Sequence, residues 1–438
     1  MGGICGSFGP HENLEELVES IRTEHDRVLY ATNPGVALVG KEGTCLGDGF
    51  LFGEIYSEND PAEYIKEKIE DTSKSLADLA RNADGEFAIV VFENEKLCVA
   101  RDFFGKMPTY IKRKPTFQFL TANIPSSKSL RRTRMPEGSS ILARKGKIAK
   151  KYSRPTFKYR KKRIDFFTSI PLIKDNLTSA IERRAESHKR FDILFSGGLD
   201  STLLSTIAKE HANVRLITIG TEDCDDVASA IEIEEELGTK LKVVDLTPEI
   251  VEKHASHLIE SIGSSDVIDF EIAFPVYVAG LNSKSKYLLS GQGADELFGG
   301  YFKYNEAYKE SPDKFEEMQL RDLRDIGKNN LERDYFAAKA AGCIISTPYL
   351  TPDMLKIALS TDTMTKINVR QNKLVLRRIA EDMGLPESVY MRKKKALQYG
   401  CGIHEILRKL AKEKGFSKDV AKTNGYMGPL DMMVRSLQ

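Results

Sequence analysis

The sequence contains no tryptophan, only seven histidines and no pair of cysteines at CxxC spacing. Its six cysteines lie singly, and no histidine accompanies them at metal-ligand spacing, so the pattern excludes a disulfide framework and a zinc site. No apolar run approaches the roughly 20 residues of a membrane helix, and the N-terminus lacks the layout of a signal peptide. These absences predict a cytoplasmic protein with reduced thiols and no membrane association.

An excess of charge of one sign is also lacking. The 65 Lys and Arg residues balance 64 Asp and Glu residues and leave a formal net charge of +1, which favours neither an acidic nor a basic partner. A hydrophobic content of 41% in 438 residues is enough for ordinary cores. The length predicts two or three domains.

The chain is organised around the segment Ser196-Gly197-Gly198-Leu199-Asp200-Ser201. It follows an apolar run and precedes apolar residues at helical spacing, so we predict a strand, a tight loop and a helix start. Adjacent glycines let a backbone approach a ligand closely, and serine hydroxyls and helix N-terminal N–H groups donate to phosphate oxygens. The alternative is a packing turn that binds nothing.

This loop lacks the GxxxxGKS spacing that cradles β- and γ-phosphates. We therefore interpret it as a grip for pyrophosphate, which implies that ATP is cleaved between its α- and β-phosphates. A carboxylate at position 200 would repel phosphates unless Mg2+ lay between them, and Mg2+ prefers one or two carboxylates plus phosphate oxygens. Asp200 therefore predicts a magnesium site.

A second segment of similar character follows downstream. Residues 287–290 predict a short buried strand that runs into Gly291-Gln292-Gly293-Ala294-Asp295-Glu296 and on to Tyr301. Strand ends that carry glycines and carboxylates are where open α/β sheets bind ligands. Helices and strands alternate between the two segments, which predicts a βαβαβ unit and a parallel sheet. The expected elements are a helix at 175–188, a strand at 214–219, a helix at 226–237 and a strand at 240–244. After Tyr301 we expect the chain to become helical, with helices at 325–339 and 371–383.

Together the two segments resemble the asparagine synthetase family, whose synthetase domain carries SGGxDS and a later SGxGxDExFGGY. The resemblance, shared with β-lactam synthetases, implies an α/β parallel-sheet domain like the adenine nucleotide α-hydrolases, with a helical C-terminal part. It implies that Asp200 and Asp295 hold Mg2+ on ATP. The ATP-binding residues that it implies are Phe195, Ser196, Gly197, Gly198, Asp200, Ser201, Ile219, Gly220, Gly291 and Gly293. For Ile219 and Gly220, a simple glycine turn is the alternative.

Residues 1–157 predict a sheet-rich α+β domain, in part because residues 85–92 and 97–100 alternate as a hairpin would. This part resembles the family's class II glutamine amidotransferase domain, which has the N-terminal-nucleophile hydrolase fold. The matching pieces are residues 84–88, residues 101–110 and the strands around Pro136-Glu137-Gly138. Residues 158–438 would then form the synthetase domain.

The amidotransferase-like domain departs from the family where its chemistry should be. The family's nucleophilic Cys after the initiator Met is Gly2 in this chain. Phe52 stands where the family has an Asn that helps to stabilise the oxyanion, and loss of one such donor costs about 10²–10³ in rate. Cys5 could act as a displaced nucleophile only after processing, and the alternative is a small buried residue in the first strand. We predict that the domain keeps its fold and lacks glutaminase activity.

Two basic stretches invite a functional interpretation. Residues 131–163 hold fourteen Lys or Arg against one acid, Glu137, and could contact a nucleic-acid backbone. We favour solvated strands and a linker, because no aromatic array or binding motif accompanies the charge. The second stretch, Arg392-Lys393-Lys394-Lys395, resembles the family's RxKxxxxxG loop, whose Lys lies on the α-phosphate and the reacting carbonyl. In register that residue is Lys394, a predicted catalytic group. The alternatives are Lys393 or Lys395, each one residue out of register, and a solvated basic face.

Two further departures bear on the substrate. Gln292 stands where asparagine synthetases have a Glu that takes a proton from the amine, so it is a catalytic candidate that can orient an amine without acting as a base. The family's Glu-Ala-Arg segment corresponds to residues 344–350, which contain neither an acid nor an Arg. A pocket for aspartate would need a fixed cation for the α-carboxylate, so aspartate fits poorly.

We therefore predict an ATP-dependent amide-forming ligase. Mg-ATP would adenylate a substrate carboxylate, and an amine, by default ammonia not made from glutamine in this chain, would displace AMP. One alternative is adenylation of a nucleobase oxygen in tRNA, which only the basic stretch supports. Another is a catalytically silent regulatory homologue. The sequence leaves the oligomeric state open, a homodimer included.

Overall fold

The computed structural model describes residues 3–7, 12–19, 28–30, 36–39, 43–46, 49–57, 63, 72–93, 96–112, 117–121, 133–144, 147–154, 156–160, 162–392 and 397–438. Contacts divide the chain into two compact units. The N-terminal unit contains Met1–Lys158, Arg324–Tyr335 and Thr351–Leu355, and the C-terminal unit contains Tyr159–Leu323, Phe336–Leu350 and Lys356–Gln438. Among the residues in these ranges, no helix is both long enough and apolar enough to span a membrane.

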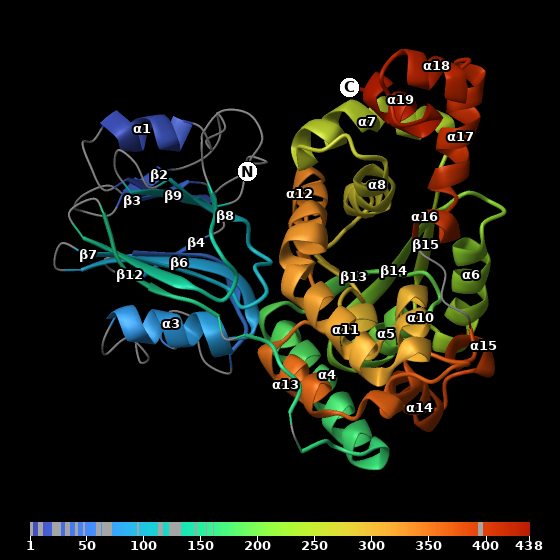
Figure 1. Cartoon of the computed structure of the whole chain (residues 1–438), viewed down its shortest axis with the longest axis horizontal. Helices are drawn as coiled ribbons and strands as arrows, with labels where there is room; N and C mark the ends of the chain where they lie inside the picture. Colours follow the sequence, from blue (N-terminus) through green and yellow to red (C-terminus); the bar gives the residue numbers. More distant parts are fainter. Residues whose placement is uncertain are drawn as a thin grey trace. The chain divides into compact units, whose positions relative to one another are not determined.

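The N-terminal unit is built on two six-stranded antiparallel sheets. The first has the order β10 (Thr133–Arg134), β8 (Thr109–Lys112), β9 (Gln118–Thr121), β1 (Gly3–Ser7), β3 (Val36–Val39) and β2 (Val28–Tyr30). The second has the order β12 (Lys147–Tyr152), β11 (Ser140–Arg144), β7 (Lys96–Arg101), β6 (Gly85–Glu93), β5 (Gly49–Ile55) and β4 (Gly43–Cys45). Helices α1 (Glu12–Glu19) and α3 (Thr72–Asn82) lie on the two outer faces of this pair of sheets (Figure 1). This unit is sheet-rich, and the expected hairpin is present as the antiparallel pair of β6 and β7.

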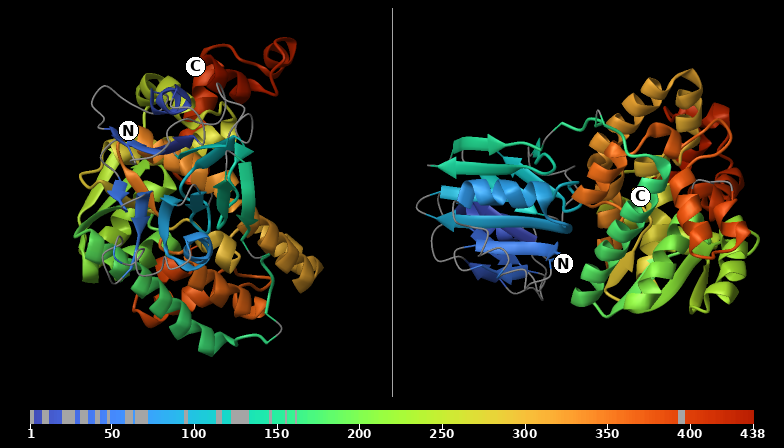
Figure 2. Two further views of the ribbon diagram at one scale, coloured as in Figure 1. Left: turned by 90° about the vertical axis from the view of Figure 1, so that its left-hand side faces the viewer. Right: turned by 90° about the horizontal axis from the view of Figure 1, so that it is seen from below.

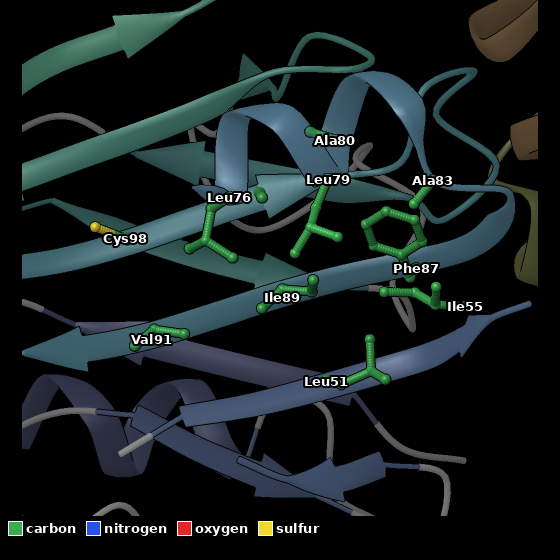
Figure 3. Packing of buried hydrophobic residues seen from close by; sticks show 11 residues of the cluster. Leu51, Ile55, Leu76, Leu79, Ala80, Ala83, Phe87, Ile89, Val91 and Cys98 are labelled. Atoms are coloured by element: carbon green, nitrogen blue, oxygen red, sulfur yellow. The ribbon is translucent and has the colours of Figure 1, made fainter. Parts of the chain in front are cut away.

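Helix α3 covers the second sheet and closes one core of this unit. Its residues Leu76, Leu79 and Ala80, at helical spacing, point toward the strands, and Phe87 and Ile89 of β6, two residues apart, point toward the helix (Figure 3). Seen from below, α3 lies over its sheet and runs roughly along the strands (Figure 2, right). Burial of each large apolar side chain stabilises the unit by roughly 1.5–3 kcal/mol.

The C-terminal unit contains a five-stranded parallel sheet. Its order is β15 (Leu241–Asp245), β14 (Asn213–Gly220), β13 (Arg190–Leu194), β16 (Tyr287–Leu289) and β17 (Ile344–Ser346). The predicted parallel βαβαβ unit is therefore confirmed. The chain proceeds from β13 in one direction to β15 and then returns to β16 on the other side of β13. A sheet of this kind opens a crevice at the reversal, so the ends of β13 and β16 are where a ligand is expected.

Helices make up the rest of the C-terminal half. Their bounds are α4 (Phe166–Ser187), α5 (Leu199–His211), α6 (Asp225–Leu237), α7 (Pro248–Ile262), α8 (Val267–Leu281), α9 (Ala294–Phe298), α10 (Phe302–Glu310), α11 (Pro312–Ile326), α12 (Glu332–Ala340), α13 (Pro352–Ser360), α14 (Leu374–Asp382), α15 (Glu387–Tyr390), α16 (Leu397–Gly400), α17 (Ile403–Glu413), α18 (Lys418–Thr423) and α19 (Pro429–Ser436). Short π and 3-10 turns occupy Gly327–Leu331 and Thr363–Thr365.

Two helices differ from the expected bounds. Helix α4 begins at Phe166 and not near residue 175, because the Asp165 carboxylate caps it by accepting a hydrogen bond from Thr168 N at 3.0 Å. The helix expected at 325–339 is interrupted by the π turn, which begins at Gly327. A side chain at Gly327 would lie 2.3 Å from the carbonyl oxygen of Phe104, so the turn admits a backbone approach that a regular side chain would block.

Candidate active site

The Ser196 loop leaves the end of β13 and enters α5 as predicted from the glycines. Gly197 has φ +64°, and a side chain there would lie 2.6 Å from the backbone of Ser229 in α6, so only glycine fits. Gly198 is the N-cap of α5. Within the loop, Ser201 Oγ donates to Gly198 O at 3.2 Å and accepts from Ser196 N at 3.4 Å. The fold therefore places a tight turn and a helix N-terminus at the end of a central strand.

The second segment packs directly on this loop. A side chain on Gly291 would lie 3.0 Å from Asp200 Cβ and 3.4 Å from Ser201 N, so the two segments, 90 residues apart in sequence, meet backbone to backbone. Gly293 has φ +94°, and Leu350 fills the space where its side chain would be. The short helix α9 starts there and carries Asp295 in its first turn. The reversal between β13 and β16 thus brings the two predicted metal ligands, Asp200 and Asp295, to one point.

Lys373 lies between these two aspartates. Its Nζ is 2.5 Å from Asp200 Oδ2 and 2.5 Å from Asp295 Oδ1, and its side chain is only 4% exposed. Lys373 has φ +53° and is the single non-glycine residue with positive φ in the described part of the chain. Such backbone strain in a buried charged residue is a mark of functional sites. Gly300 makes room for it, since a side chain there would lie 2.2 Å from Lys373 Cε.

The donor set at this point suits a magnesium ion that is shared with phosphates. Asp200 Oδ1 is buried and accepts no hydrogen bond from any described residue, so one carboxylate oxygen remains available to a ligand. Within the described ranges, no group of three or more His, Cys, Asp or Glu side chains forms an all-protein cation site. Two carboxylates with phosphate oxygens match the preference of Mg2+, and Asp200 and Asp295 would hold it.

Residues 344–350 pack on both segments. The Tyr349 hydroxyl donates to the carbonyl oxygen of Asp200 at 3.1 Å, and Leu350 contacts Gly293. Burial, with the nearby charges of Asp200 and Asp295, raises the pKa of Tyr349 well above its usual range, so the phenol stays a neutral donor. The stretch in which the sequence lacks an acid and an Arg is therefore in direct contact with the site.

The end of β14 lies one strand away from the loop. Phe195 N donates to Ile217 O at 2.9 Å, and Phe195 and Ile219 are buried. A side chain on Gly220 would lie 2.3 Å from Cys224 Sγ and 3.3 Å from Cys401 O, so packing alone accounts for this glycine. A role of Ile219 and Gly220 in adenine binding stays a prediction.

The structure describes only one of the two predicted catalytic residues, and the catalytic role of both stays a prediction. Gln292 lies between Gly291 and Gly293, and its backbone N donates to Ser290 Oγ at 3.2 Å, which fixes the turn on which its side chain stands. Lys394 lies outside the described residues, between Arg392 and Leu397. Arg392, the last described residue before it, donates to Ser196 O at 2.8 Å and thus reaches the loop.

In the N-terminal unit, Cys5 is fully buried in β1, where it pairs with Ala37 of β3 and Leu120 of β9. This placement agrees with a small core residue, because a thiol inside a sheet cannot attack a bound glutamine. Phe52 is buried in β5. Gly2 lies outside the described residues, so its predicted effect rests on its lack of a side chain.

Sequence reasoning missed the roles of Lys373 and Tyr349, and it placed Arg392 in the RxKxxxxxG-like loop without its contact to the Ser196 loop. They lie 173, 149 and 196 residues from the loop residues that they contact. Neither Lys373 nor Tyr349 carries a motif that points to this site, and charged and polar side chains usually lie on the surface. The one feature of the sequence that could have pointed to Lys373 is Gly300. No turn requires a glycine there, and its missing side chain leaves the space that Lys373 fills.

The chain is similar to several known proteins. A Methanocaldococcus jannaschii protein named as asparagine synthetase (glutamine-hydrolyzing) 1 is 27% identical over 499 residues, which covers 98% of this chain and 91% of that protein. Asparagine synthetase B of Escherichia coli is 27% identical over 349 residues, 73% of this chain and 61% of that enzyme. The structure of NMN synthetase from Francisella tularensis matches with a TM-score of 0.31 at 12% identity, over 60% of this chain and 92% of that one. The sequence model of the family Asparagine synthase matches residues 172–314 and 307–429, which is more than half of the chain and includes both aspartate segments. The chain therefore belongs to the asparagine synthase family.

Proposed function

We propose that this protein is an ATP-dependent amide-forming ligase that activates a carboxylate as its acyl adenylate. The observation that carries the proposal is the meeting of Asp200 and Asp295 at the reversal of a parallel sheet, beside a glycine loop and a helix N-terminus. That arrangement suits a nucleotide pyrophosphate bound through Mg2+. Family membership supports the same reaction class.

In the first step, an oxygen of the substrate carboxylate attacks the α-phosphorus of ATP. The bond between the α-phosphorus and the bridging oxygen breaks, and pyrophosphate leaves. Ser196, Ser201 and the N–H groups at the start of α5 are available to bind that pyrophosphate. Mg2+, when bound, would neutralise charge on the leaving group.

The second step consumes the adenylate. A neutral amine attacks the acyl carbon, the bond to the adenylate oxygen breaks, and AMP leaves with that oxygen. Lys394 would stabilise the charge that develops on phosphate and carbonyl oxygens in both steps. Gln292 would orient the amine but cannot take its proton, so the proton passes to another base or to solvent.

Lys373 contributes the charge that two neighbouring carboxylates need when no metal is present. We propose that the Lys373 ammonium also contacts the phosphates of bound ATP. Asp200 and Asp295 hold this ammonium at the point where they would hold the metal, which lies beside those phosphates in this proposal. A site with two acids and one fixed base carries a net charge of −1, which a divalent cation reverses in sign. Mg-ATP therefore fits better than free ATP.

We propose that the substrate whose carboxylate is adenylated is not aspartate. The segment against the site, residues 344–350, offers hydroxyls and apolar side chains and has no cation for a second carboxylate. We also propose that the amine is free ammonia or another small amine. The N-terminal unit, which we interpret as a degenerate domain of the N-terminal-nucleophile hydrolase fold, lacks the groups to release ammonia from glutamine.

The test is ATP–pyrophosphate exchange by the whole protein over a panel of carboxylates, with a tRNA arm. Exchange that depends on one carboxylate supports the ligase. Exchange that depends on tRNA would replace it with nucleobase adenylation. No exchange with any substrate, together with tight binding of ATP, would favour a silent regulatory homologue.

A further inference from the structure

Arg392 holds the carbonyl oxygen of Ser196. Its NH1 group donates to Ser196 O at 2.8 Å, and its NH2 group contacts Asp225 O and Asp226 Oδ1, each at 3.2 Å. The C=O and N–H of a trans peptide point in opposite directions. The bond from Arg392 therefore fixes the plane of the Ser196–Gly197 peptide and turns the Gly197 N–H to the side away from Arg392.

Arg377 of α14 in turn holds the backbone at Arg392. Its NH1 group donates to the carbonyl oxygens of Tyr390 and Arg392, the latter at 3.2 Å. Burial lowers the pKa of Arg377, but an arginine remains charged in this range. Both of these acceptors are backbone carbonyls, so these two bonds fix the course of the chain at residues 390–392.

The same guanidinium reaches the second segment through Asn372. Arg377 Nε donates to Asn372 O at 2.7 Å and its NH2 group donates to Asn372 Oδ1 at 2.9 Å. Asn372 Nδ2 donates to Gly300 O at 2.7 Å, at the end of the segment that carries Asp295. A continuous chain of hydrogen bonds thus runs from Gly300 through Asn372, Arg377 and Arg392 to Ser196.

We propose that Arg392 and Arg377 are positioning residues that hold the Ser196 loop and the Asp295 segment together as one phosphate-binding unit. Neither residue needs to touch the nucleotide. Arg392 sets the orientation of a loop peptide, and Arg377 fixes Arg392 relative to Gly300. The assignment rests on the proposed use of ATP at this site, which it deepens by naming the residues that preorganise it.

The test compares Arg392→Gln and Arg377→Gln with Arg378→Gln, whose parent is half exposed on α14 and pairs with Asp382 and Glu381. Hydrogen bonds to charged groups contribute about 1.5–3 kcal/mol, so we expect the affinity for Mg-ATP, measured by calorimetry, to fall about 10- to 100-fold in the two test variants. The control should bind like the parent. In the exchange reaction, KM for ATP should rise more than kcat falls.

A second readout separates positioning from mere stability. Arg392 is partly exposed, so added guanidinium should restore Mg-ATP binding to Arg392→Ala. Because the two arginines act through one network, the double variant Arg377→Gln/Arg392→Gln should bind Mg-ATP little worse than the single variant with the lower affinity. Unchanged affinity in Arg392→Gln would overturn the proposal. So would a loss of affinity that tracks a fall in melting temperature and is not rescued. Because binding is measured without turnover, a parent protein that binds Mg-ATP but shows no exchange would refute the proposed reaction and leave this test intact.

Discussion

At the scale of single residues, the site consists of charges held at short range. One buried ammonium, that of Lys373, bridges two carboxylates at 2.5 Å from each. An isolated buried charge is costly, and breaking a buried pair by removing one partner costs about 3–5 kcal/mol. Each of the three side chains would therefore affect both the fold and the proposed binding of a metal nucleotide, so stability and activity must be measured together.

Asparagine at either acidic position should abolish exchange. In Asp200→Asn or Asp295→Asn, ATP–pyrophosphate exchange should fall on the order of 10²-fold or more, because a metal supplies several kcal/mol of transition-state stabilisation. Asp313→Asn, at an exposed position in α11, is the control. Exchange at the parent rate in both site variants would rule out this metal site.

Removal of the Lys373 ammonium should make the stability of the protein depend on Mg2+. In Lys373→Met the two carboxylates face each other without compensation, so the melting temperature should fall, and added Mg2+ should recover more of it than in the parent protein. Differential scanning fluorimetry with and without Mg2+, in the absence of nucleotide, measures this.

The double variant Asp200→Asn/Lys373→Met provides the control for that prediction. It removes one of the repelling charges, so it should regain stability without Mg2+ and lose the response to it. A Lys373→Met variant that is as stable as the parent, with an unchanged response to Mg2+, would show that the bridge has no such role.

The residues that could be predicted from the sequence are those that local backbone geometry constrains. Gly197 and Gly293 stand out because a positive φ in a strand-to-helix turn favours glycine, and the acids beside them follow from phosphate chemistry. Lys373 could not be predicted, because its partners are set by the tertiary fold and its strained backbone leaves no sequence pattern.

At the scale of elements, the short helix α9 depends on its neighbours. It spans only Ala294–Phe298, too short to be stable alone. Gln319 of α11 donates from Nε2 to the carbonyl oxygens of Glu296 and Leu297 at 2.8 and 2.9 Å, which satisfies acceptors at the end of α9. Lys366, fully buried, donates to Gln319 Oε1 at 3.2 Å and so fixes the orientation of that amide.

Lys366 should make stability depend on pH. Burial lowers its pKa to about 7, whereas an unfolded lysine titrates near 10.4, so between these values the unfolded chain binds more protons. The free energy of unfolding should therefore rise with pH from about 7 to 10, by up to about 1.4 kcal/mol per pH unit from this group. Urea unfolding across that range measures the slope.

Comparison of slopes isolates the contribution of this residue from all others that titrate. In Lys366→Met the rise of the free energy of unfolding between pH 7 and 10 should lose the contribution of this amine, whatever the variant's absolute stability. Lys309→Met, at an exposed position of α10, should keep the slope of the parent protein. Equal slopes in the parent and in Lys366→Met would mean that the buried amine keeps its ordinary pKa.

Elements with strong periodicity could be predicted, and those shaped by packing could not. Strands β14, β15 and β16 and helix α6 appear within one or two residues of their expected bounds because apolar residues at strand or helix spacing mark them in the sequence. The π turn at Gly327–Leu331 arises from the approach of Phe104, a contact across more than 200 residues that no window of sequence contains.

At the scale of the whole molecule, we propose that the chain combines a nucleotide site with a sheet-rich N-terminal unit that lacks glutaminase activity. Asp102 and Lys106 of that unit remain in a buried network in which the backbone N of Lys106 and Met107 donate to the Asp102 carboxylate at 2.9 and 2.8 Å. Lys106 Nζ lies 2.9 Å from Glu86. Buried polar networks of this kind specify a fold, so the unit can keep its structure without keeping a nucleophile.

Glutamine should therefore not support turnover. The purified protein should release no glutamate from glutamine, and ammonium or another free amine should be required for product formation. Glutamate release, followed by an enzyme-coupled assay, is the measurement. Hydrolysis that disappears in Cys5→Ala would contradict the account and would make that buried thiol the nucleophile.

The central claim is that a carboxylate oxygen attacks the α-phosphorus of ATP. The most direct test supplies the accepted carboxylate labelled with oxygen-18, together with Mg-ATP and ammonium, and locates the label by mass spectrometry of the nucleotide and phosphate products. The account predicts one labelled oxygen in AMP and none in pyrophosphate, because the acyl adenylate breaks between the acyl carbon and that oxygen. Label in inorganic phosphate, with ADP as the nucleotide product, would show attack on the γ-phosphorus and would contradict the account.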